Sequence, residues 1–221
     1  MIPVALAAEP ASFEKTVRLP GLSAIDEFVG RPPRLKRRGP KRSPIAATED
    51  KIPPDMFPPF WRLALDEMLD RYDRRCAYLA MYIHHATGSP TVDHVLPKSY
   101  AWQLVYEWTN YRLCAAIINS KKSDLLNLID PFEIETGWFE LDLTTFHVVR
   151  GQTAPAAQHA KIDATLPVLN QRDCWKEREE YVFRYRLGPT NKGIDLTYLE
   201  DRAPFVAREL RRQEKLERGD K

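Results

Sequence analysis

The residues with the clearest chemistry are Asp93 and His94, followed along the chain by Asn110 and Asn119. A histidine suits the role of general base because its unperturbed pKa, about 6.5, lies near neutral pH. Carboxylate and amide oxygens suit a hard divalent cation such as Mg²⁺, which keeps several waters. Such a cation neutralises phosphoryl oxygens and stabilises a departing alkoxide. The four residues together therefore predict phosphodiester hydrolysis, with Asp93 and Asn119 as metal ligands and His94 as the base.

The elements that carry Asp93 and His94 must place two neighbouring side chains around one phosphate. Adjacent residues of a regular strand point to opposite faces of the sheet. A short strand is predicted over residues 91–96 and is ended by Pro97. At the end of such a strand the two side chains can diverge around one group.

Asn110 and Asn119 are expected on two different elements after that strand. Asn110 falls in a predicted loop, residues 107–111, where its amide can bond backbone groups and hold the histidine-bearing loop in place. We include it in the catalytic set for this structural role. Asn119 ends a predicted apolar helix, residues 113–119, which would bring the second metal ligand to the site.

Basic residues around this segment are candidates for contact with the phosphates of a nucleic acid. Those expected to make such contacts are Lys98, Lys121, Lys122, Arg37 and Arg38. The last two belong to a proline-rich arm, residues 31–60, whose first part is basic without any acid. Two interpretations of the arm stay open: a solvated tether, or an arm that gains from counterion release on phosphates.

Three segments together resemble the signature of the HNH (ββα-metal) nucleases. They are VDHVLPK at 92–98, WTNYRLC at 108–114 and NSKKSD at 119–124, the last similar to the helix of the HNH domain in CRISPR effector nucleases. The resemblance implies a metal ligand at Asp93, the general base at His94, a loop-ordering residue at Asn110 and a second metal ligand at Asn119. The chain would thus be an H-N-N variant that uses Mg²⁺ or Mn²⁺.

The chain departs from the many HNH proteins that bind a structural zinc through two Cys-x-x-Cys pairs. The corresponding positions are Cys76 with Leu79, and Cys114 with Ile117, so each pair keeps one cysteine. Two thiolates cannot close a four-ligand zinc site. We expect no zinc, with Leu79 and Ile117 packed instead, and Cys76 and Cys114 can still lie close together.

More of the chain resembles small HNH proteins that are encoded beside ATPases in Septu-type bacterial anti-phage systems. The segments are EPASF at 9–13 with Val17-Arg18, DPF at 130–132 with GWF at 137–139, and APFV at 203–206. This resemblance implies an endonuclease that acts on nucleic acid, DNA in preference, with a possible ATPase partner and a role in antiviral defence. Two alternatives stay open: an RNA nuclease, for instance on tRNA, or a non-catalytic subunit that binds nucleic acid or a partner on an HNH scaffold.

Composition indicates a cytoplasmic protein without a membrane segment. The 221 residues carry a net charge of only +2 and three cysteines, an odd number that argues against a disulfide framework. The apolar start is followed at once by Glu9 and does not resemble a signal peptide. No apolar run approaches the roughly 18 residues of a membrane span.

The expected fold is α+β, with a small ββα-metal core, an extended basic N-terminal arm and a C-terminal helical region. We divide the chain at 1–60, 61–130 and 131–221. Further predicted elements are a helix over 22–29 capped by Ser23, a helix over 60–75, a strand over 76–83, strands of a hairpin at 138–143 and 145–149, and two or three helices after 156.

Overall fold

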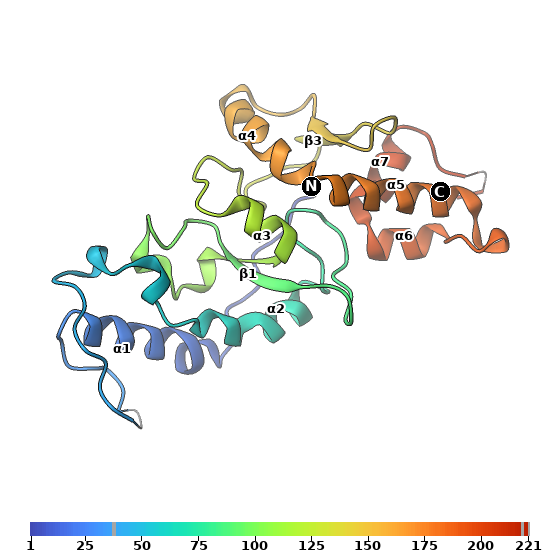
Figure 1. The fold of residues 1–221 in the computed structure, drawn as a ribbon. Coiled ribbons are helices and arrows are strands. Elements are labelled where there is room, and N and C mark those ends of the chain that lie inside the picture. Colours follow the sequence, from blue (N-terminus) through green and yellow to red (C-terminus); the bar gives the residue numbers. More distant parts are fainter. Residues whose placement is uncertain (37–38, 218, 221) are drawn as a thin grey trace.

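The structure, a computed structural model, describes residues 1–36, 39–217 and 219–220, and combines α-helices with two small antiparallel sheets (Figure 1). In the described residues the α-helices are α1 Leu19–Phe28, α2 Leu65–Arg71, α3 Ala116–Lys122, α4 His159–Leu169, α5 Arg172–Leu187, α6 Leu196–Arg202 and α7 Pro204–Arg212. The strands are β1 Pro90–His94, β2 Tyr111–Ala115, β3 Phe139–Leu141 and β4 Val148–Arg150. None of the helices described is long and apolar enough to cross a membrane.

Helix α1 begins earlier than the sequence predicts, and the basic arm folds back along it. Ser23 lies inside the helix, buried, and its Oγ accepts the N–H of Leu35 at 3.2 Å, so its prediction as a cap is wrong. Arg34 pairs with Asp26 at 2.8 Å and Arg42 with Glu27 at 2.7 Å. The arm is therefore attached to α1 through at least these two arginines, although most of its described residues are exposed. Arg37 and Arg38 lie outside the described residues.

The segment 76–83 is not the strand that its aromatic and branched residues predict. It forms turns, with a single bridge between Arg75 and Tyr82, and Ala80 has a positive φ of 51°. Most of its side chains are buried although they do not alternate along an extended strand. An apolar run can be buried by neighbouring elements without forming a strand. The composition of residues 76–83 therefore does not suffice to predict a strand there.

The first sheet joins β1 and β2 in antiparallel register, from Pro90 opposite Ala115 to His94 opposite Tyr111. Residues 95–110 connect the two strands, and α3 follows β2 directly. The predicted helix over 113–119 therefore starts too early, because Leu113 still belongs to the sheet. α3 contacts both strands and α4, so it is held between the first sheet and the C-terminal helices (Figure 1).

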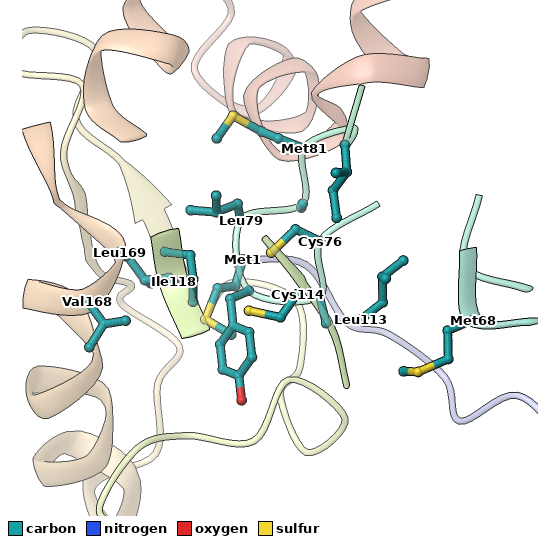
Figure 2. Packing of buried hydrophobic residues seen from close by; sticks show 14 of the residues in the cluster. Met1, Met68, Cys76, Leu79, Met81, Leu113, Cys114, Ile118, Val168 and Leu169 are labelled. Atoms are coloured by element: carbon teal, nitrogen blue, oxygen red, sulfur yellow. The ribbon is translucent and has the colours of Figure 1, made fainter. Parts of the chain in front are cut away.

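Buried residues from distant segments fix the position of α3. Figure 2 shows Ile118 of α3 among Cys114, Leu79 and the α4 residues Val168 and Leu169. Ile118, Cys114 and Leu169 are fully buried. Burial of an aliphatic side chain of this size contributes about 1.5–3 kcal/mol, so the register of α3 against the sheet is well defined.

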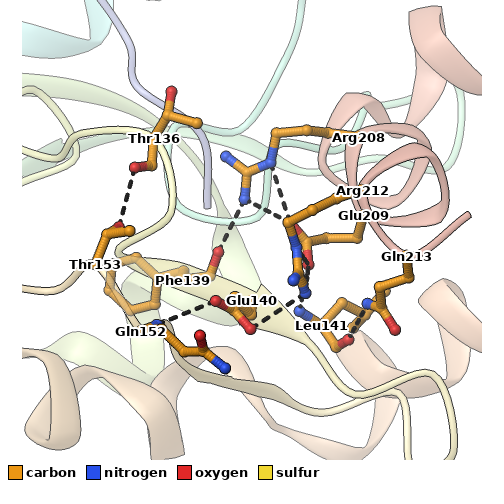
Figure 3. A network of polar contacts seen from close by, with 10 residues as sticks. All are labelled: Thr136, Phe139, Glu140, Leu141, Gln152, Thr153, Arg208, Glu209, Arg212 and Gln213. Carbon is orange, nitrogen blue, oxygen red and sulfur yellow. Dashed lines mark hydrogen bonds and ion pairs between the residues drawn. The ribbon is translucent and has the colours of Figure 1, made fainter.

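The predicted hairpin near residue 140 is confirmed as β3 and β4, and it is bound to α7 by polar contacts (Figure 3). The buried carboxylate of Glu209 accepts the N–H of Leu141 at 3.0 Å, and Arg208 donates to the carbonyl of Phe139 at 2.9 Å. Gln213 donates to the carbonyl of Leu141 at 2.8 Å. These bonds satisfy backbone groups of β3 that lack a partner strand.

Candidate functional site

The Asp93 side chain is buried beneath the first sheet and both of its oxygens are engaged. Tyr78 donates its hydroxyl to Oδ2 at 2.6 Å, and the Lys122 ammonium lies 3.1 Å from Oδ1. Asp93 and Lys122 are 2% and 1% exposed, so water screens their attraction little. The carboxylate is thus held in one orientation by partners from the 76–83 segment and from α3.

Lys122 is directed inward, whereas the sequence alone predicts a surface contact with phosphate. Its ammonium also donates to the carbonyl oxygens of His94 at 2.7 Å and Val95 at 3.3 Å. The neighbouring Lys121 is exposed, and Lys98 is half-buried with its Nζ 4.6 Å from the centre of the Trp61 ring. Of the three lysines, Lys121 and Lys98 can reach a phosphate as they stand, while Lys122 must first move.

Asn119 lies on the same face of α3 as Lys122, one turn earlier, and contacts β1. Its Nδ2 donates to Thr91 Oγ1 at 3.1 Å. Thr91 and Asp93 share one face of β1, because alternate residues of a strand point the same way. Asp93 therefore lies on the face of β1 that is turned toward α3, and Asn119 lies on the face of α3 that is turned toward β1. The direct partner of Asp93 from α3, however, is Lys122.

The His94 ring is held at the end of β1 with one nitrogen bonded. Its Nε2 lies 3.0 Å from the carbonyl oxygen of Val105, which can only accept a hydrogen bond, so we assign the proton to Nε2. Nδ1 then carries the lone pair that a general base needs. Trp61 and Tyr111 pack against the ring in T-shaped arrangements, with centroid distances of 5.0 and 5.2 Å.

Burial lowers the pKa of His94 to about 4, with further lowering by the positive charges of Lys98 and Lys122. The hydrogen bond to Val105 acts in the opposite direction. The imidazole is consequently neutral at pH 7, the form that can accept a proton. The lowered pKa also makes it a weaker base than a solvated histidine. A general base works best with a pKa near the working pH, so this shift reduces its efficiency.

Asn110 closes the loop between β1 and β2. Its Oδ1 accepts the N–H of Leu96 at 2.9 Å, and its Nδ2 donates to the carbonyls of Leu96 at 3.1 Å and Leu104 at 3.2 Å. The residue is buried, and its backbone carbonyl accepts the N–H of Val95. These bonds hold both ends of the loop that supplies the Val105 carbonyl to His94.

Cys76 and Cys114 lie next to each other in the core (Figure 2). Burial alone raises the pKa of the Cys76 thiol, but hydrogen bonds from the Cys114 thiol and from backbone N–H groups bring it to about 7. Leu79 is buried, and Ile117 is half-buried beside a cavity of about 370 Å³. The expectation of no structural zinc stays a prediction. Within the ranges described, no three His, Cys, Asp or Glu side chains gather so as to hold a metal ion.

Three residues of the site carry no signal in the sequence that would assign them to it. Tyr78 was expected only as part of a strand, and Trp61 only as one apolar position of a helix. Val105 acts through its backbone carbonyl, which every residue possesses. All three reach the site from distant positions, so local spacing does not reveal them.

Comparisons with known proteins leave the family open. No protein-family model matches the chain, and no curated protein is found to be similar to it.

Proposed function

We propose that the chain is a metal-dependent HNH endonuclease that hydrolyses phosphodiester bonds in nucleic acid, DNA in preference. The observation that carries this proposal is the order β1, β2, α3, with His94 at the end of β1 and with Thr91 and Asp93 facing Asn119 and Lys122. Strand, strand and helix in this order are what the three resembling segments imply for a ββα-metal core.

The donor set fits a hard divalent cation. Asp93 offers a carboxylate oxygen and Asn119 an amide oxygen, both of the kind that Mg²⁺ or Mn²⁺ prefers. Two protein ligands are enough, because Mg²⁺ usually keeps several waters. The cation would neutralise charge on the scissile phosphate. Tyr78 fixes the orientation of Asp93 at the same time.

His94 would take the proton of the attacking water at Nδ1. Its Nε2–H donates to Val105, which stabilises the ring orientation and the positive charge that forms on proton transfer. Asn110 holds the loop that presents this carbonyl. Lys98 and Lys121 would contact phosphates on either side, in line with their greater exposure.

The role in anti-phage defence and the ATPase partner belong to this proposal through the Septu-type resemblance, and the cytoplasmic location belongs to it through the composition. One observation favours the non-catalytic alternative: the Asp93 carboxylate already has two partners. An RNA substrate requires the same groups, so the assay must offer both nucleic acids.

The test is cleavage of supercoiled plasmid and of tRNA by the purified full chain, with Mg²⁺, with Mn²⁺ and with EDTA. His94→Ala should lower the cleavage rate by about 10²–10⁴-fold, the usual contribution of a general base. His85→Ala, which removes an exposed histidine outside the site, should cleave like the unmodified chain. The nuclease proposal fails if neither nucleic acid is cut with either metal, or if His94→Ala cuts as fast as His85→Ala.

A further inference from the structure

The buried ammonium of Lys122 already occupies a site built for a cation. Its Nζ lies 3.1 Å from Asp93 Oδ1, 2.7 Å from the carbonyl oxygen of His94 and 3.3 Å from that of Val95. A carboxylate and two carbonyls are also the oxygen types that hard metal ions take as ligands. We name this arrangement the oxygen cage.

Lys122 and a divalent cation cannot both be close partners of the same Asp93 oxygen. At separations of a few ångströms in a buried place the repulsion between two cations is large. An isolated Asp93 carboxylate would in turn be costly in the interior, so some cation must remain near it. The site therefore has two possible occupants for one negative charge.

Space for a displaced Lys122 side chain exists beside the cage. A cavity of about 260 Å³ is lined by Lys122 itself and by Tyr78, Asn110 and Glu133. Lys122 sits at the last residue of α3, and the following Ser123 has a positive φ of 43°. Because Lys122 is the last residue of α3, its side chain can leave Asp93 while Ile118, the other buried residue of this helix, stays in place.

We propose that Lys122 is a tethered cation that competes with the divalent metal for Asp93, so that metal binding moves Lys122 out of the oxygen cage. This inference rests on the proposed metal site and adds a mode of regulation to it. In the metal-free protein, Lys122 neutralises the buried Asp93 carboxylate and fills the oxygen cage. Once displaced, Lys122 becomes available to a phosphate, the role that the sequence indicates.

The first test measures the affinity for Mn²⁺ alone, by the electron paramagnetic resonance signal of free Mn²⁺, in the full chain and in two variants. Lys122→Met removes the competitor and keeps the length of the side chain. We expect its Kd to fall by about 5–150-fold, the usual range of coupling between two linked binding events. Lys121→Met removes the neighbouring exposed charge and should leave the Kd within about twofold of the original.

The second test needs no variant, because Lys122→Met can fail to fold with Asp93 unpaired. An amine-acetylating reagent is applied to the unmodified chain with and without Mg²⁺, and the two lysines are separated by peptide fragmentation. Lys121 should react equally in both conditions, whereas Lys122 should react only with Mg²⁺ present.

The outcomes separate this inference from the proposed function. Binding of Mn²⁺ with an unchanged Kd in Lys122→Met, or with Lys122 still protected in Mg²⁺, overturns the competition and leaves the nuclease proposal standing. Absence of Mn²⁺ binding in both the original chain and Lys122→Met overturns the metal site itself.

Discussion

Replacement of Asn110 by alanine tests whether one buried amide holds the loop of the site. The side chain makes three hydrogen bonds, two to Leu96 and one to the carbonyl of Leu104. Each contributes about 0.5–1.5 kcal/mol, and a buried group left without a partner costs about 1–3 kcal/mol more. The neighbouring cavity of about 260 Å³ touches Asn110, Leu96 and Leu104, so water can replace part of what is lost. We expect a loss of about 2–3 kcal/mol in the free energy of unfolding.

Urea denaturation followed by tryptophan fluorescence measures this loss. Thr109→Ala, at the exposed neighbouring position, is the control and should change stability by less than about 0.5 kcal/mol. Hydrogen exchange should show faster exchange of the amides of residues 95–110 in Asn110→Ala, because their anchor is gone. A loss below about 0.5 kcal/mol, or unaltered exchange in this loop, would refute the reasoning that Asn110 orders it.

Three further changes have defined outcomes. His94 has a pKa of about 4 in the folded protein, against about 6.5 in the unfolded chain. Its effect on the free energy of unfolding should therefore be absent above pH 6.5 and reach a loss of about 3 kcal/mol as the pH drops to 4. Urea titrations of His94→Gln should lack this pH-dependent loss. Gly21→Ala places a Cβ 2.3 Å from the Tyr106 ring and should cost about 1–3 kcal/mol, and an unchanged melting temperature would contradict that packing. Glu209→Ala leaves the N–H of Leu141 unpaired and should cost about 2–4 kcal/mol by calorimetry, whereas a neutral result would mean that the contact with α7 is dispensable.

The sequence predicts the parts of the site that depend on local order. A strand that ends before Pro97, a loop that holds Asn110 and a helix that carries Asn119 all exist in the structure, with boundaries shifted by a few residues. The hairpin near residue 140 was likewise visible as alternation. These features follow from turn residues and short-range periodicity, which the chain carries in each segment.

Contacts between distant segments were not predictable in the same way. The bond from Tyr78 to Asp93 and the ion pairs of Arg34 and Arg42 with α1 depend on tertiary packing. The inward direction of Lys122 has a weak signal in hindsight, because residues three apart share a helix face and Asn119 was expected to point at the site. Two adjacent lysines do not otherwise indicate which one is buried.

The most direct test of the central claim is the location of Mn²⁺ by anomalous diffraction from crystals of the full chain soaked in that ion. The account predicts an anomalous peak between the side-chain oxygens of Asp93 and Asn119, within ligand distance of both and near the His94 ring. A peak elsewhere, or none at a Mn²⁺ concentration that saturates binding in solution, would contradict a metal-dependent site at the end of β1.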